Sequence, residues 1–158
     1  MTLLTDETVR VSAPRARIWS VFDDAAALRR VLPGCEALDA TGPGTFRGVL
    51  ATKLPFLTLR ADVTATLAGV ERPDRLRLEL DGRPRGLAGS FRAVIPIDLA
   101  EDGADTLVHY RVDLTTSGRL AAFGAPLMRD TMKRQVAALI ANLETELGSG
   151  ARGEDTGA

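Results

Sequence analysis

The chain has 158 residues, of which 45% are hydrophobic and 26% are charged, and its net charge is −1. This length suits one domain of roughly 100–150 residues and is too short for two. The 20 basic and 21 acidic residues disfavour nucleic-acid binding, for which a basic excess is typical. A single cysteine and a single histidine exclude an intrachain disulfide and the usual Cys/His zinc site.

Hydropathy and the N-terminal residues bear on the cellular location. No apolar run approaches the roughly 20 residues needed to span a bilayer. The first residues, MTLLTDETVRV, lack the basic and apolar zones of a signal peptide. We therefore expect a soluble, cytoplasmic protein.

The first predicted elements are a strand and a broken helix. Residues 3–11 alternate loosely, as an edge or half-buried strand does. Pro14 behind a serine is a helix-start signal. The helix that follows ends before Pro33, because proline cannot continue an interior turn. Its apolar face comprises Ile18, Trp19, Phe22 and Leu28.

After this helix the apolar period changes from about 3.6 to 2, which predicts further strands. Five are expected, separated by turns rich in glycine and proline, at residues 44–54, 57–70, 75–81, 90–99 and 106–116. Pro96 falls on the outward phase of its strand, which indicates an edge or bulged position. Short connections imply an antiparallel meander.

A long amphipathic helix is predicted at the C-terminal end of the domain. A stripe of apolar side chains covers roughly 22 residues, or about 33 Å, and comprises Met128, Met132, Val136, Leu139, Ile140, Leu143 and Leu147. Gly124 and Pro126 at its start predict a kink or a second helix start. We expect one domain over residues 1–147 and a disordered tail over residues 148–158.

A concave sheet packed by one long helix leaves a space between the two, and small inward residues such as Ala61 and Ala65 enlarge it. The same inward side chains also fit a plain hydrophobic core. Tyr110 and Gln135 are the polar groups expected to orient a ligand carbonyl. The candidate ligand-binding residues are Phe46, Leu50, Leu59, Phe91, Tyr110, Phe123, Met128, Met132 and Gln135.

The connection around residues 53–57 is unusually apolar for a turn. If it is exposed, its side chains form a cavity lid or touch a membrane surface, and if it folds under, they are core. The residues concerned are Leu54, Pro55, Phe56 and Leu57.

The residues offer little for catalysis. Cys35 lies in a turn and His109 on an outward strand phase, so nothing indicates the hydrogen-bond contact that a nucleophile and its base require. The carboxylates also fall on outward phases. The glycines near residue 86 lie between two strands, which does not match a phosphate-binding loop. No catalytic residue and no metal ligand is predicted.

Several motifs over residues 3–147 resemble one known family. The most specific is Leu32-Pro33-Gly34-Cys35. It is accompanied by Val11-Ser12-Ala13-Pro14, by Ile18-Trp19, by Gly44-Thr45-Phe46-Arg47-Gly48 and by Gly118-Arg119-Leu120-Ala121-Ala122-Phe123-Gly124. These resemble the START-like (SRPBCC) superfamily and, within it, the family of the carbon monoxide dehydrogenase G subunit.

The resemblance implies an α+β helix-grip fold of the START/Bet v 1 type, with a curved antiparallel sheet wrapped around a long C-terminal helix. It implies a non-catalytic carrier of a hydrophobic molecule such as an isoprenoid quinone or a lipid. Its partner would be a molybdenum-containing carbon monoxide dehydrogenase, whose recruitment to the inner face of the membrane or electron delivery through a bound quinone it would support. Some relatives carry a longer C-terminal anchoring extension, so only peripheral membrane contact is expected here.

Two alternatives remain open. The same superfamily contains polyketide cyclase- and hydrolase-like enzymes acting on apolar substrates, and polar side chains converging in the pocket would favour that class. The second alternative is a docking protein whose surface matters more than its cavity.

Overall fold

The computed structural model describes the backbone of residues 2–157 and the side chains of residues 3–148. The elements follow the order β1 (Thr2–Val11), α1 (Arg15–Phe22), α2 (Ala25–Val31), β2 (Cys35–Gly42), β3 (Thr45–Lys53), β4 (Thr58–Glu71), β5 (Arg75–Pro84), β6 (Gly89–Asp102), β7 (Asp105–Gly118), the 3-10 helix η1 (Arg119–Phe123) and α3 (Gly124–Gly157). The predicted tail falls almost entirely on residues outside the described side chains, so it stays a prediction.

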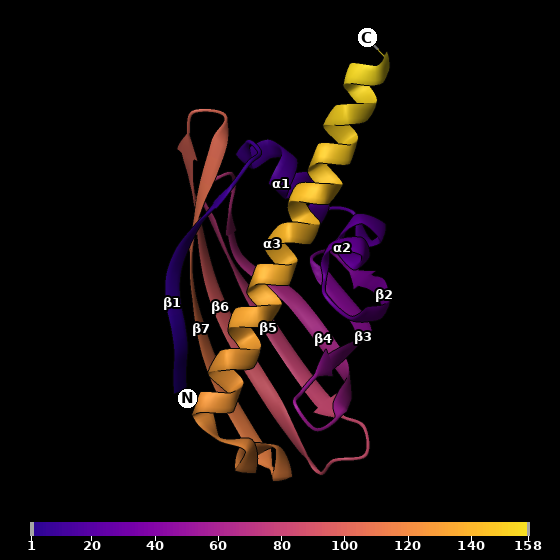
Figure 1. Cartoon of the computed structure of the whole chain (residues 1–158), viewed down its shortest axis with the longest axis vertical. Helices are drawn as coiled ribbons and strands as arrows, with labels where there is room; N and C mark the ends of the chain where they lie inside the picture. The colour runs from indigo at the N-terminus through magenta and orange to yellow at the C-terminus, as the bar shows by residue number, and fades with distance from the viewer. Residues whose placement is uncertain (1, 158) are drawn as a thin grey trace.

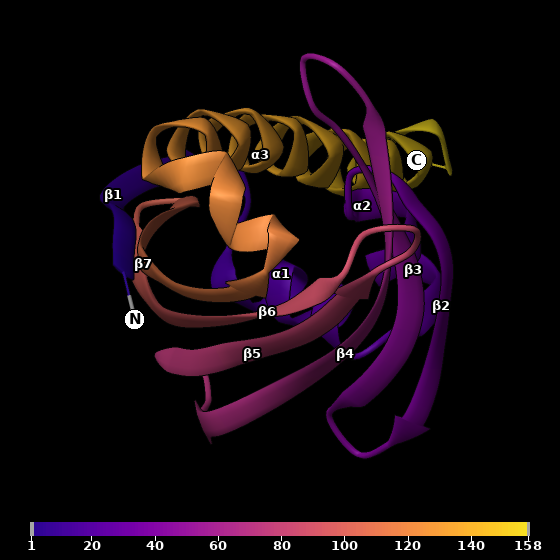
Figure 2. The same ribbon diagram turned by 90° about the horizontal axis from the view of Figure 1, so that it is seen from below.

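The strands form one antiparallel sheet in the order β1-β7-β6-β5-β4-β3-β2. Figure 1 shows α3 running across one face of this sheet, with α1 and α2 beside its C-terminal half. Figure 2 shows the sheet curving so that β1 and β2 lie on opposite sides of that helix. The predicted α+β helix-grip fold is therefore confirmed.

The alternation of side chains in β4 explains which face of the sheet turns toward α3. Ala61, Val63 and Ala65 are buried, whereas Arg60 and Asp62 are exposed. Because successive strand residues point to opposite faces, this period of two buries one apolar face under the helices. The predicted inward phase of this strand is thus the observed one.

Two predicted details differ from the structure. β2 was not predicted, since its sequence CEALDATG carries only one buried apolar side chain, Leu38, and residues such as Asp and Gly are poor strand formers. Pro96 lies in β6, between β5 and β7 rather than at an edge. The β6–β7 pairing skips residues 95 and 96, because proline has no N–H to donate to the ladder.

α3 is attached to the helix pair through its C-terminal half. The Arg30 guanidinium makes a bidentate ion pair with Glu146 (2.8 and 2.9 Å), and the Asn142 side chain donates to the Val31 carbonyl at the end of α2 (3.0 Å). Leu143 and Leu147 are buried in the same cluster as α1 and α2. These contacts fix the helix across the sheet at one end.

Within the described part of the chain, no helix is both long and apolar enough to cross a membrane.

Candidate functional site

The candidate site lies where the inner face of the sheet meets the N-terminal half of α3. There Met128, Met132 and Val136 pack against a cluster built around Tyr110 and Val112. Its other members are Leu4, Val9, Ile95, Ile97 and Leu114. The N-terminal half of α3, which carries Met128 and Met132, therefore packs against β1, β7 and β6. Its C-terminal half packs against α1 and α2.

Three apolar side chains on the inner face of β3, β4 and β6 are less completely buried than Tyr110 and Val112. Leu50, Leu59 and Phe91 share the strand phases of buried Phe46, Ala61 and Ala93, yet all three are only half-buried. Among the described side chains, none of these three belongs to a packed core cluster. Half-buried apolar side chains on the helix side, outside the core clusters, are available to contact a ligand.

A loop and a short helix meet beside this uncovered surface. The ring of Phe56, in the connection between β3 and β4, packs edge-on against Phe123 of η1 with centroids 5.5 Å apart. Leu54 is buried and its N–H donates to the Leu57 carbonyl (2.8 Å). Pro55 is exposed, and Phe56 and Leu57 have exposed fractions of 60% and 40%. Of the predicted lid, Leu54 is thus core and the other three residues lie outside.

Two polar groups accompany the apolar surface. The Tyr110 hydroxyl donates to a carboxylate oxygen of Glu7 (3.1 Å), its partner across the β1–β7 ladder. Burial, together with this carboxylate, raises the pKa of Tyr110 to about 12, so the phenol keeps its proton at any physiological pH. The half-buried Gln135 side chain has no hydrogen-bond partner among residues 3–148, which leaves its amide free for a ligand.

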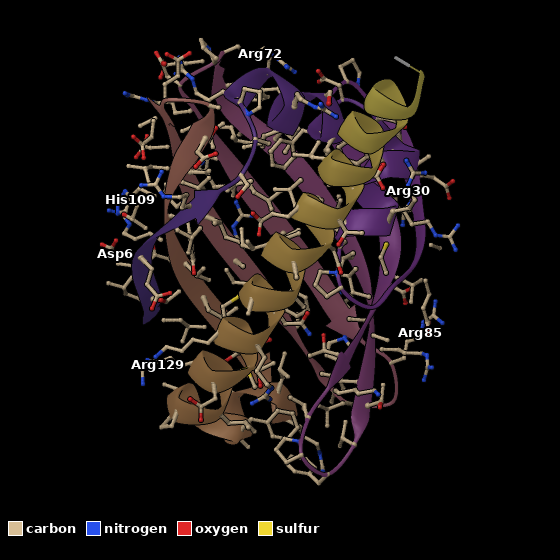
Figure 3. All side chains as sticks on the ribbon, turned by 45° about the horizontal axis from the view of Figure 1, so that its top comes forward. Asp6, Arg30, Arg72, Arg85, His109 and Arg129 are labelled. Atoms are coloured by element: carbon tan, nitrogen blue, oxygen red, sulfur yellow. The ribbon has the colours of Figure 1, made fainter. Side chains whose placement is uncertain are left out.

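The structure does not bring Cys35 and His109 together. Cys35 begins β2 at one edge of the sheet, whereas His109 lies on β7 next to the opposite edge. The thiol donates to the Ala37 carbonyl (3.3 Å), and burial raises its pKa. His109 lies against Asp6 (2.6 Å) on the outer face, as Figure 3 shows. Cys35 and His109 therefore do not form a nucleophile–base pair.

Sequence reasoning missed two surface hollows. The larger, of about 650 Å³, lies on the outer face of the sheet and is lined mainly by polar side chains such as Arg47, Asp62 and Arg92, with Phe91 at its edge. The smaller, of about 400 Å³, is called the end pocket below, and its lining includes Phe22, Phe46, Leu67, Val70, Asp23 and Arg72. Both combine segments far apart in sequence, so no local pattern indicates them.

Within residues 3–148, no group of three His, Cys, Asp or Glu side chains is arranged to hold a metal ion.

The chain forms a strand, a helix pair, a curved six-stranded meander and a long helix that crosses the sheet. This arrangement defines the START-like helix-grip class. The model of the family described as the G subunit of carbon monoxide dehydrogenase (CoxG) matches residues 8–148. The chain therefore belongs to the CoxG family, which confirms the resemblance seen in the sequence motifs. A search among curated proteins found no match.

Solved structures support the fold at low sequence identity. A conserved protein from Geobacillus kaustophilus is similar with a TM-score of 0.81 and 18% identity, covering 90% of this chain and 93% of its own. A START superfamily protein from Mycobacterium smegmatis gives 0.70 and 13%, covering 92% and 97%. The ZhuI aromatase/cyclase from Streptomyces sp. R1128 gives 0.65 and 15%, covering 90% and 91%.

Proposed function

We propose that this protein binds a hydrophobic small molecule, quinone-like or lipid-like, between the inner face of the sheet and α3. The observation that carries the proposal is the half-burial of Leu50, Leu59 and Phe91 on the face that the helix covers. Removing such apolar surface from water favours binding by roughly 25 cal/mol per Å² before ordering costs.

The chemistry of the surrounding side chains supports the same class of ligand. Met128 and Met132 line the facing side of α3, and methionine adapts its shape to irregular apolar ligands. The Gln135 amide is a donor suited to a carbonyl oxygen, such as that of a quinone, whereas the Tyr110 hydroxyl already donates its proton to Glu7. A mostly apolar site with a few placed donors is typical of small-molecule pockets.

In this proposal the connection at residues 53–57 is the lid. The contact between Phe56 and Phe123 closes the end of the site, and its opening lets the ligand exchange. The exposed Pro55, Phe56 and Leu57 then touch the membrane surface peripherally, because exposed apolar clusters mark interaction sites. The protein would act at the inner, cytoplasmic face of that membrane.

Membership of the CoxG family supports a partner for the bound molecule. We propose that this carrier supports electron delivery by, or membrane recruitment of, a molybdenum-containing dehydrogenase of the carbon monoxide dehydrogenase type. The bound isoprenoid quinone would then serve as the electron acceptor, and the chain itself would contribute binding and release rather than catalysis.

A second candidate function is a cyclase-like enzyme acting on an apolar substrate. One observation favours it: the hydroxyl of Tyr110 and the carboxylate of Glu7 meet on the helix side of the sheet. The Glu7 carboxylate, which accepts the phenolic hydrogen bond, is suited to take a proton from a substrate as a general base. A fold neighbour is an aromatase/cyclase, so turnover of polyketide-like substrates is the discriminating assay.

The ligand-binding proposal is tested by competition with a fluorescent apolar dye, anilinonaphthalene sulfonate, using a short-chain ubiquinone as competitor. We expect saturable dye binding that the quinone displaces. Leu59→Trp, which fills the uncovered surface, should abolish displacement, whereas Leu3→Trp at an exposed position should leave it unchanged. Equal displacement in both variants would reject the interior site.

A further inference from the structure

Charge is distributed unevenly between the two ends of the molecule. At one end, the α1–α2 junction and the turns after β4 and β6 bring together the carboxylates of Asp23, Asp24, Glu71, Asp74, Glu101, Asp102 and Asp105. We call this the acidic end. The other end carries Lys53, Arg83, Arg85, Arg119 and Arg129, and its carboxylates include Asp130 and Asp62, the latter paired with Arg85. Figure 3 shows Arg72 at the first end and Arg85 and Arg129 toward the second.

The arginines at the acidic end are already engaged. Arg72 pairs with Asp23 (2.5 and 3.0 Å), and Arg15 bridges Asp74 (2.8 Å) and Glu101 (3.3 Å). Arg75 lies 3.5 Å from Glu71, and Arg10 pairs with Asp102. The carboxylates outnumber these cations, so the acidic end keeps a negative potential that attracts cationic partners.

The end pocket lies at this end of the molecule, since Asp23 and Arg72 belong to its lining. Its walls are apolar, from Phe22 of α1, Phe46 of β3 and Leu67 of β4, and Val70 at 41% exposure leads into it. Its volume of about 400 Å³ falls within the range of about 300–1,000 Å³ typical of binding pockets. The charged residues of the lining are the paired Asp23 and Arg72, and the carboxylates of Asp24 and Glu71 neighbour them in the chain. Such an apolar hollow with carboxylates beside it fits an apolar side chain that basic residues flank.

The polar rim of the end pocket is held in place before any partner arrives. The Arg72 guanidinium stacks 4.3 Å above the centre of the Trp19 ring, and the Trp19 indole N–H donates to the Pro73 carbonyl (3.0 Å). The Arg72 guanidinium also makes the bidentate ion pair with Asp23. A rigid rim lowers the ordering cost of association.

We propose that the acidic end is a protein-docking surface for a basic segment of a partner, anchored by one aromatic or aliphatic side chain in the end pocket. This goes beyond the ligand-binding proposal and does not depend on it, because the interior surface and the end pocket use different side chains apart from Phe46. The two ends of the molecule would then face different partners.

A tryptophan-free peptide, acetyl-Lys-Lys-Phe-Lys-Lys-amide, is the probe for this surface. We expect saturable changes in the fluorescence of Trp19, the single tryptophan, and amide NMR shifts centred on Gly42, Gly44 and Val70. Replacing the peptide's Phe with Ala should weaken binding about tenfold or more, given the transfer free energy of a buried aromatic ring. A Glu-Glu-Phe-Glu-Glu peptide should not bind.

Two pairs of variants locate the site. Glu71→Lys should weaken binding about threefold or more at low salt, whereas Asp130→Lys, the same charge change at the other end, should not. Val70→Ser should weaken binding, while Leu3→Ser should not. Equal affinity of the Phe and Ala peptides, shifts centred elsewhere, or the absence of saturable binding would each overturn the proposal.

Discussion

The ring of Phe91 lies directly across Gly82, its partner on the neighbouring strand. A Cβ atom at Gly82 would stand 2.2 Å from Cζ of that ring. Glycine at this position therefore lets the aromatic side chain lie flat over the strand and covers an otherwise bare stretch of backbone. The same ring contributes to the half-buried surface proposed to bind the ligand.

Gly82→Ala should displace Phe91 and cost about 1–3 kcal/mol of unfolding free energy, since overpacking forces rotamer or backbone shifts. Chemical denaturation measures the change. Gly42→Ala is the matched control, because a Cβ there meets no atom within 4 Å. Equal stability of the two variants would contradict the role assigned to this pair.

Phe56→Ala should accelerate ligand exchange while changing stability little, because Phe56 is 60% exposed and its ring packs edge-on against Phe123. Such an aromatic pair contributes roughly 0.5–1.5 kcal/mol. Stopped-flow release of the dye from wild type, both single variants and Phe56→Ala/Phe123→Ala measures the coupling. Additive effects on the release rate would show that the pair does not act as a latch.

His109 should titrate above its ordinary pKa of 6.5, because hydrogen bonding and proximity to the carboxylates of Asp6 and Asp98 favour the imidazolium. Because the pKa of His109 is higher in the folded than in the unfolded state, its interaction with these carboxylates stabilises the fold fully below about pH 6.5. This stabilisation is lost as the pH rises through the folded-state pKa. NMR titration of this single histidine in wild type and Asp6→Asn measures it. A pKa that Asp6→Asn leaves unchanged would contradict the assignment.

Cys35 should react slowly with thiol reagents. Burial raises its thiol pKa, and the thiolate is the reactive form. Reaction with Ellman's reagent at pH 8 should be several-fold slower than that of free cysteine and should reach the free rate in denaturant. A rate above that of free cysteine would instead indicate an activated thiol.

The fold was largely predictable because its strands carry clean local patterns. In β4 the buried Ala61, Val63 and Ala65 follow the period of two seen in the sequence. β2 escaped prediction, since its position depends on pairing with β3 and on the Glu36–Arg60 ion pair (3.0 Å) rather than on its own composition. Long-range pairing overrides weak local propensity in such edge strands.

The site was less predictable than the fold. The sequence phase places Leu50, Leu59 and Phe91 on the helix side, but whether they pack depends on how far the sheet curves from α3. The end pocket depends on the approach of Phe22 to Leu67 and Val70, which lie far from it along the chain. Separations of that kind leave no periodic signal in the sequence.

Native mass spectrometry of the gently purified protein, followed by organic extraction, tests the central claim most directly. The account predicts a stoichiometric hydrophobic adduct, a quinone or lipid, that Leu59→Trp loses and Leu3→Trp retains. A clean apo mass, with no uptake when quinones and fatty acids are offered, would contradict it.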